Sequence, residues 1–317
     1  MAHLRLSVKY IIAAENDTVP DRHDTRSYAS KKERLPFMKS ISGGVQARHL
    51  PGVSLAAFLL LSSSALAGPP FVTDDPEPVD YLHWELYTFS MGTHAMAETD
   101  GVAPSFEINY GVLPNVQLHV QPGMAVHEAG GGPVEWGPGD TEFGVKYRFI
   151  EQGKTSWVPS AAIYPLLEAP TGDAARGLGT GRTHAFVPLW VQKDFDDWTT
   201  YGGGGYWINP GPGNKNYWLM GWVLQRKITG KLALGVELFH QTPNAIGGVP
   251  STGFNFGSVP STGFNAGGIY DFTDHYHFLF SFGKGLQHAK ETNEFSWYIG
   301  LQATGGEEPP KAQEAAP

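Results

Sequence analysis

Apolar and polar residues alternate along most of this chain, and this period of two limits the fold more than any other feature. Residues 140–149 read DTEFGVKYRF, with aromatic and aliphatic residues at most odd positions and charged residues at most even ones. Side chains of a β-strand alternate between its two faces. The pattern therefore predicts strands with one apolar and one charged face, and it recurs in 106–112, 115–121, 231–239, 275–282 and 295–301.

The alternation predicts twelve strands, which start near residues 80, 101, 114, 139, 156, 183, 197, 215, 230, 260, 275 and 292. Short connections between them (LPN, EQGKT, FDD, ITG and TD) take turns with long ones, such as GTHAMAETD, APTGDAARGLGTGR, NAIGGVPSTGFNFGSVP and GLQHAKE. Even strand number, tight periplasmic turns and longer external loops are typical of bacterial outer-membrane barrels. We therefore expect an all-β fold: a closed antiparallel transmembrane β-barrel of about 12 strands, with short periplasmic turns and long extracellular loops.

A soluble β-sandwich or a lipocalin-like barrel also has alternating strands, but its apolar face points inward. Alternation alone does not tell which face is outside. The regular exchange of short and long connections favours the membrane barrel, and so does an export signal.

The export signal is the apolar segment 51–67, PGVSLAAFLLLSSSALA, with Lys39 and Arg48 upstream. A short apolar run that ends in small residues is typical of a secretory signal peptide, and a buried helix of a soluble domain is the alternative. The expected organisation is an untranslated upstream extension at 1–37, a signal peptide at 38–67, the barrel at 68–304 and a disordered tail at 305–317.

Composition excludes several classes of function. The chain has no cysteine, so disulfides and thiolate metal sites are excluded. Residues 68–317 hold 13 Lys and Arg against 26 Asp and Glu, which makes nucleic acid a poor partner. The same residues contain no apolar run long enough for a membrane helix.

Four segments carry a resemblance to a known family: GPPFVTDDPEPVDYLHWELYTFS, GPGDTEFGVKYRF, PLLEAPTGDAARGLGTG and FNAGGIYDFTDHYHFLFSFGKGL. They resemble the outer-membrane barrels named after the meta-cleavage pathway of phenol degradation, which are catalogued as porin-like or transport proteins. The resemblance implies a porin-like role and supplies no site residues. It also implies outer-membrane lipid, lipopolysaccharide and the barrel-assembly machinery as partners, although the chain ends in GGEEPPKAQEAAP rather than on an aromatic residue.

Polar residues out of phase with the apolar face line the lumen of such a barrel. The candidates are Glu107, His119, Glu142, Lys146, Arg148 and Glu237. Charges of both signs can hold a wet pore or close the interior with ion pairs. Twelve strands lie between barrels that side chains fill and barrels with wide channels, so a narrow passage is expected. Asp74 and Asp75 are expected to form an acidic leader before the first strand.

Two loop features sit at the predicted mouth. GLGTGR at 177–182 is followed by a strand and not by a helix, so it indicates a loop rather than a phosphate site. Arg176 and Arg182 there can contact lipopolysaccharide phosphates or an incoming anion. The repeated VPSTGFN at 249–255 and 259–265 indicates a tandem duplication in an external loop; alternatively Phe254, Phe256 and Phe264 form an aromatic patch at the pore mouth.

No catalytic residue, cofactor or metal site is predicted. His275 and His277 near Asp271 and Asp274 are interpreted as interfacial polar residues, and no sequence context marks a serine nucleophile. The sequence thus favours a porin-like channel for passive uptake of small solutes, hydrophobic or aromatic ones among them. The alternatives are a closed structural or adhesive barrel without conductance and, more weakly, an outer-membrane hydrolase.

Overall fold

The computed structural model describes residues 69–96, 98–153, 157–246 and 258–307. Nearly all of its elements are strands: β1 (His83–His94), β2 (Glu98–Leu113), β3 (Val116–Gln121), β4 (Gly123–Ala129), β5 (Glu135–Pro138), β6 (Thr141–Ile150), β7 (Ser160–Ile163), β8 (Leu166–Ala169), β9 (His184–Phe195), β10 (Trp198–Ile208), β11 (Tyr217–Thr229), β12 (Leu232–Gln241), β13 (Ser261–Asp271), β14 (Tyr276–Gln287) and β15 (Phe295–Gly306). Two single turns of helix, η1 (Ala174–Arg176) and α1 (Ala289–Thr292), complete them. Neither of these described helices is long and apolar enough to cross a membrane.

Fifteen strand segments make twelve spanning strands, because β3 and β4, β5 and β6, and β7 and β8 are halves of three interrupted strands. Two of the interruptions contain proline, at Pro122 and Pro165. Proline has no N–H to donate to a ladder. Its carbonyl still accepts: Phe106 N donates to Pro122 O at 2.9 Å, and Val145 N donates to Pro165 O at 3.2 Å. The neighbouring strands therefore stay attached across the breaks.

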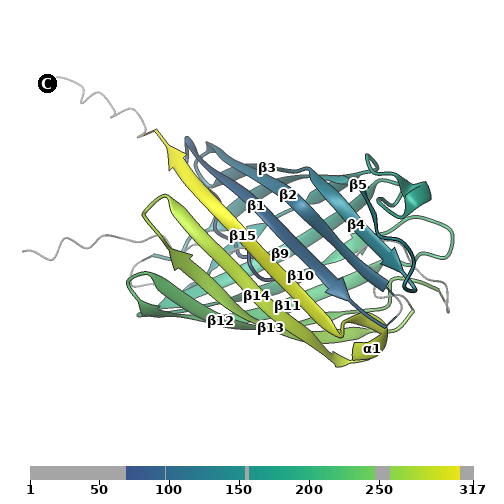
Figure 1. The fold of residues 1–317 in the computed structure, drawn as a ribbon. Coiled ribbons are helices and arrows are strands. Elements are labelled where there is room, and N and C mark those ends of the chain that lie inside the picture. Colours follow the sequence, from purple (N-terminus) through teal and green to yellow (C-terminus); the bar gives the residue numbers. More distant parts are fainter. Residues whose placement is uncertain (1–68, 97, 154–156, 247–257, 308–317) are drawn as a thin grey trace, which may run out of the picture. The chain divides into compact units, whose positions relative to one another are not determined.

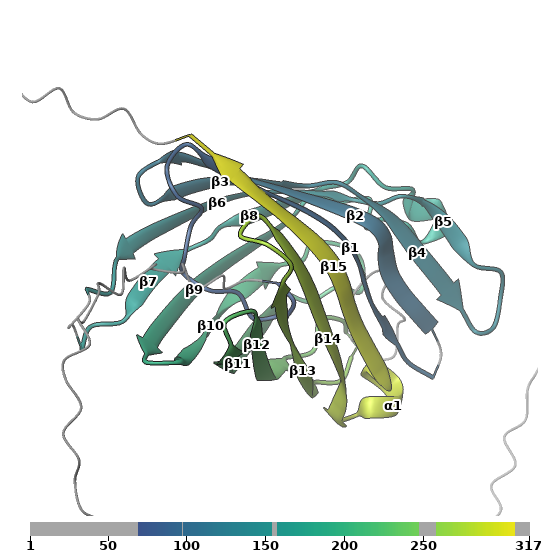
Figure 2. The same cartoon turned by 60° about the vertical axis from the view of Figure 1, so that its left-hand side comes forward.

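The sheet closes on itself. Neighbouring strands pair antiparallel around the ring, and β1 pairs with β15 along its whole length, from His83 opposite Gly306 to His94 opposite Phe295. Figures 1 and 2 show these two strands side by side. Closure removes the edge between the first and the last strand, as strands in lipid require, and among the described strands the short β5 pairs only with β4. The predicted closed twelve-stranded antiparallel barrel is confirmed.

Connections at the two ends differ, with one departure from expectation. Short turns at one end include Asn115 and Asp196, whose φ angles of 64° and 53° lie in the left-handed region that Asn and Asp tolerate. Figure 1 shows α1 and the β4–β5 hairpin at the opposite end from the end of β15. The expected long first loop is wrong, because β1 and β2 extend until Ala95 N donates to Glu98 O at 2.8 Å. The last strand also runs two residues past its expected end, to Gly306.

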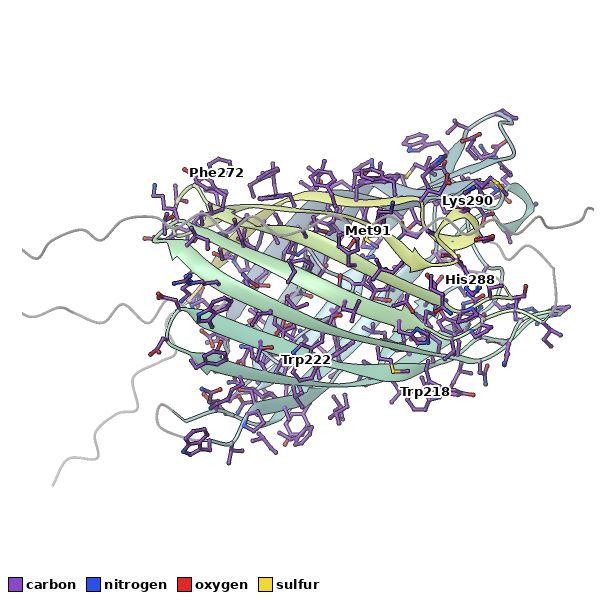
Figure 3. All side chains as sticks on the ribbon, turned by 90° about the horizontal axis from the view of Figure 1, so that it is seen from below. Met91, Trp218, Trp222, Phe272, His288 and Lys290 are labelled. Carbon is purple, nitrogen blue, oxygen red and sulfur yellow. The ribbon has the colours of Figure 1, made fainter. Side chains whose placement is uncertain are left out.

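The apolar face of the strands points outward. On β11, Trp222 is 51% exposed whereas Val223 is fully buried, and their partners on β12 repeat the contrast, with Leu238 outside and Glu237 inside. Figure 3 shows the side chains that project from the outer surface, with Trp218 and Trp222 among them. An outer surface of this kind is stable only against hydrocarbon. This excludes the soluble alternatives and places the chain in the bacterial outer membrane, where barrels of this kind occur.

Several expectations fall on residues outside the described ranges. They are the upstream extension, the signal peptide, residues 308–317 of the tail, and the first VPSTGFN copy with Phe254 and Phe256.

Candidate functional site

Residues 69–80, here called the lumen segment, cross the inside of the barrel before β1 begins. Near one end Ser281 Oγ on β14 donates to Pro70 O at 2.5 Å, and at the other Val79 N donates to Gln117 Oε1 on β3 at 2.9 Å. These two strands lie far apart around the ring. Gly221 on β11 makes room for the crossing, since a Cβ there would overlap the Thr73 side chain.

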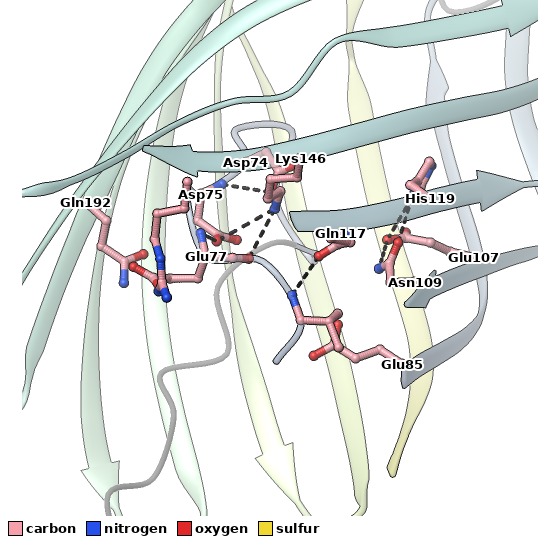
Figure 4. Close-up of polar contacts among 12 residues, drawn as sticks. Asp74, Asp75, Glu77, Glu85, Glu107, Asn109, Gln117, His119, Lys146 and Gln192 are labelled. Carbon is pink, nitrogen blue, oxygen red and sulfur yellow. Dashed lines mark hydrogen bonds and ion pairs between the residues drawn. The ribbon is translucent and has the colours of Figure 1, made fainter. Parts of the chain in front are cut away.

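Two cations attach the lumen segment to one wall. The Nζ of Lys146 on β6 lies 3.1 Å from Asp74 Oδ1 and 3.8 Å from Asp75 Oδ1 (Figure 4). Arg148, on the same strand and face, forms an ion pair with Glu77. Lys146 is 4% exposed, so its buried ammonium needs the carboxylates of Asp74 and Asp75 to neutralise it.

Glu237 attaches the lumen segment to the opposite wall. Its carboxylate on β12 accepts Thr73 N at 2.6 Å, Val72 N at 3.2 Å and Asn265 Nδ2 at 2.6 Å. The side chain is almost completely buried. Charge-assisted hydrogen bonds to backbone N–H groups are among the stronger ones in proteins. The two walls thus hold the segment by different means, ion pairs on β6 and backbone hydrogen bonds on β12.

Asp75 is the most deeply buried group of the lumen segment, with no exposed surface. Its Oδ1 accepts Glu77 N at 2.6 Å, whereas its Oδ2 has no hydrogen-bond partner among the described residues. Burial raises the pKa of the Asp75 carboxyl well above its usual range, against the opposing attraction of Lys146.

A second polar group lies on the neighbouring strands. Asn109 Nδ2 donates to Glu107 Oε1 at 2.8 Å, and the ring of His119 joins Asn109 Oδ1 at 2.8 Å to Glu142 Oε1 at 3.2 Å. All six residues predicted to line the lumen therefore lie inside the barrel, in two groups. Lys146, Arg148 and Glu237 hold the lumen segment. Glu107, His119 and Glu142 form this histidine-centred cluster.

The predicted mouth residues have different surroundings. Arg176 forms an ion pair with Glu135 at 2.6 Å, so it links η1 to β5. Arg182 lies in the same loop, whose backbone is fixed because Asp140 accepts Gly172 N at 2.8 Å and Thr180 N at 2.7 Å.

The expectation that Phe264 belongs to a mouth patch is wrong. Phe264 lies within β13, opposite Leu238 on the outer face, and is 37% exposed. The second VPSTGFN copy runs directly into a spanning strand, so its phenylalanine faces lipid.

The candidate metal residues pair with each other. His277 Nδ1 lies 2.7 Å from Asp271 Oδ1 at a short turn. Within the described residues, no group of three His, Asp or Glu side chains is arranged to hold a metal ion.

The interior contains two chambers. The turn-side chamber, of about 1200 Å³, reaches the short turns at Lys231 and Asp274. The loop-side chamber, of about 430 Å³, reaches the long loops at Leu178 and Asn293. Asp74 lines both, so the lumen segment stands between them.

Sequence reasoning missed the lumen segment as a functional element. Asp74 and Asp75 were expected to form an acidic leader before the first strand; together with Glu77 they neutralise the inward cations of β6. The signal that could have found them is charge complementarity. Lys146 and Arg148 are the only cations in the alternating strand 140–149, and an acidic run precedes the barrel.

These features define a twelve-stranded outer-membrane barrel whose polar lumen is crossed by its own residues 69–80. No protein-family model matches the chain, and no curated protein matches it either. Among solved structures, it is similar to the COG4313 outer membrane channel from Pseudomonas putida F1, with a TM-score of 0.55 and 14% identity over 73% of this chain and 98% of that one.

Weaker likenesses are to the KdgM porin (TM-score 0.45, 10% identity, 68% of this chain and 98% of that one) and the NanC porin (0.46, 8%, 70% and 100%). At these identities the likeness concerns the fold.

Proposed function

We propose that this barrel is a channel for the passive uptake of small solutes across the outer membrane, with the lumen segment as its constriction. The observation that carries the proposal is the interior itself. Two chambers, of about 1200 and 430 Å³, are separated by one segment that polar contacts hold, rather than by a packed apolar core. Twelve strands leave room for a narrow passage of this kind.

The aromatic residues of the chamber walls favour hydrophobic or aromatic solutes. In the loop-side chamber Phe186 stacks on Trp207 at 4.8 Å between ring centroids, and Trp207 stacks on Tyr217 at 6.0 Å. Aromatic walls with a few polar groups are typical of sites for small organic molecules. The sequence resemblance to barrels named after phenol degradation supports the same class of solute.

A closed barrel with a structural or adhesive role is the second candidate, because ion pairs across the lumen can fix the segment in place permanently. It predicts no conductance. The hydrolase alternative lacks comparable support, since Ser261 Oγ donates to Thr292 Oγ1 at 3.1 Å and is buried away from both chambers.

The test is ion conductance in a planar lipid bilayer. The wild type is compared with a Lys146→Ala, Arg148→Ala double variant and with Lys284→Ala, which removes an outward-facing cation as a control. We expect small steps from the wild type and the control. The double variant should give larger, more cation-selective steps, because it releases the segment and removes two positive charges. Folded barrels without steps in all three proteins would contradict the proposal and favour the closed barrel.

A further inference from the structure

The loop-side chamber is lined by acidic side chains and, among the described residues, by no Lys or Arg. Six carboxyl groups reach it. Most of these carboxyl groups have their own partners: Asp74 has Lys146, Asp100 has His127 at 2.6 Å, and Glu142 has His119. Two of the six, Asp140 and Glu168, have no described cation within ion-pair distance. Asp140 accepts two backbone N–H groups instead, from Gly172 and Thr180.

Glu168 stands directly opposite another carboxylate. It pairs with Glu142 across β6 and β8, and with His184 across β8 and β9, so all three line the same stretch of wall. Like charges directly opposite each other on neighbouring strands are destabilising. A cation bound between the two carboxylates would remove that repulsion.

Aromatic rings adjoin these carboxylates. Phe186 follows His184 on the same face of β9 and lies 4.8 Å from Trp207 and 6.4 Å from Trp190, measured between ring centroids. The faces of Trp and Phe attract ammonium groups, most strongly where water is scarce, and their surfaces also hold apolar groups.

Unpartnered polar atoms point to a ligand independently of the carboxylates. Five buried side chains of this chamber each have an atom with no hydrogen-bond partner among the described residues: His184 Nε2, Trp190 Nε1, Gln241 Nε2, Asn293 Oδ1 and Tyr298 OH. These residues are between 1% and 6% exposed. Buried polar atoms in native proteins almost always have partners. Five such atoms around one cavity indicate a site that an outside molecule completes.

We propose that the loop-side chamber binds amines that carry an aromatic or aliphatic group. The ammonium lies between Glu142 and Glu168, and the apolar group lies against Phe186, Trp190 and Trp207. A volume of about 430 Å³ is within the range of small-molecule pockets. Six carboxyl groups without a described Lys or Arg side chain repel carboxylates and phosphates. This inference rests on the proposed channel function and deepens it, because it names the charge class of the solute.

The first test compares three probes of similar size that differ in charge: phenethylamine, phenylethanol and phenylacetate. Each is titrated by calorimetry into the intact protein, purified from outer membranes in detergent. We expect the amine to bind at least tenfold more tightly than the alcohol, and the acid to bind most weakly. Equal binding of the amine and the alcohol, or tighter binding of the acid, would overturn the proposal.

The second test locates the ammonium. Glu168→Gln should weaken amine binding about tenfold and leave the alcohol unchanged. Glu85→Gln is the matched control, since Glu85 is a half-buried inward carboxylate of the turn-side chamber. An amine preference that survives Glu168→Gln would contradict the assigned position. If Glu168→Gln does not fold, the ranking of the three probes on the wild type still decides the proposal.

Binding in detergent tests the amine site, and conductance in a bilayer tests the channel function, so the two proposals can be contradicted independently. A barrel that prefers the amine but never conducts would contradict the channel function and leave the site. A barrel that conducts without preferring the amine would contradict the site alone.

Discussion

The two chambers of the barrel differ in how their charges are used. In the turn-side chamber Lys146 and Arg148 meet the acidic groups of the lumen segment, so charges of both signs neutralise each other. In the loop-side chamber carboxylates adjoin aromatic rings, and several buried polar atoms have no described partner. In the turn-side chamber the chain's own ion pairs neutralise the charges. In the loop-side chamber polar groups stay available to a bound molecule.

The comparison shows that an inward charge does not by itself identify a pore lining. Lys146 and Glu237 face the lumen, yet both bind the chain's own residues 72–75. Glu168 faces the same lumen and binds no described cation. The partner of a charge, more than its direction, separates groups that hold the structure from groups that can meet a solute.

Removing the charge of Lys146 should have the largest effect on this arrangement. Lys146→Met keeps the length of the side chain and leaves Asp74 and Asp75 without their cation, a change that costs about 3–5 kcal/mol for buried pairs. We expect the lumen segment to detach and the chambers to merge. The measurement is maleimide labelling of Thr73→Cys, which is the only thiol in the chain because the natural sequence has no cysteine.

Thr73 is 2% exposed, so a cysteine there should label slowly in the wild-type background and quickly beside Lys146→Met. Glu85→Gln serves as the control, because its described hydrogen bond is to Tyr87 and not to the lumen segment. Equally slow labelling in all three backgrounds would show that Lys146 does not hold the segment.

The sequence was sufficient for the barrel and insufficient for its contents. Strict alternation in segments such as 140–149 determines which residues share a face, and a closed barrel then follows from the number of strands and the lengths of their connections. Residues 69–80 have neither alternation nor helical period, so no local pattern places them. Their position depends on contacts with strands such as β12, more than 150 residues away in the chain.

Phe264 illustrates a second limit. The repeat marked a loop, and the copy that continues into β13 inherited that interpretation although its alternation already matched a strand. Where a repeated sequence and an alternating pattern overlap, the alternation predicts the backbone conformation. The repeat indicates only that the segment was duplicated.

Glu237→Gln should weaken the attachment of the lumen segment to β12, and by less than Lys146→Met weakens its attachment to β6. The amide offers one acceptor oxygen where the carboxylate accepts Thr73 N, Val72 N and Asn265 Nδ2, so at least one hydrogen bond is lost, at a cost of about 1.5–3 kcal/mol. Labelling of Thr73→Cys should accelerate, but less than beside Lys146→Met. An acceleration as large as that of Lys146→Met would mean that both walls contribute equally, contrary to the comparison.

The smallest expected effect is a pH dependence carried by Asp75. Burial raises the pKa of this carboxyl above its usual value, against the attraction of Lys146, so the docked segment holds the proton more tightly than the free one. The contribution of Asp75 to the free energy of docking, that is, of holding the lumen segment in its place inside the barrel, is therefore most favourable at low pH. The contribution declines as pH rises from the free pKa of about 3.9 through the raised pKa, and is constant above it.

Asp75→Asn should flatten this part of the pH profile, because an amide does not titrate and its oxygen can still accept Glu77 N, now 2.6 Å from Oδ1. At neutral pH the amide keeps the hydrogen bond from Glu77 N and gives up the contact with Lys146, so docking should change by only about 1 kcal/mol. The test is the labelling rate of Thr73→Cys from pH 5 to pH 8, divided by the rate of the same cysteine beside Asp75→Asn, because the ratio removes the titration of the thiol itself. A ratio that falls as pH rises would reverse the sign and show that Asp75 docks as a carboxylate stabilised by Lys146.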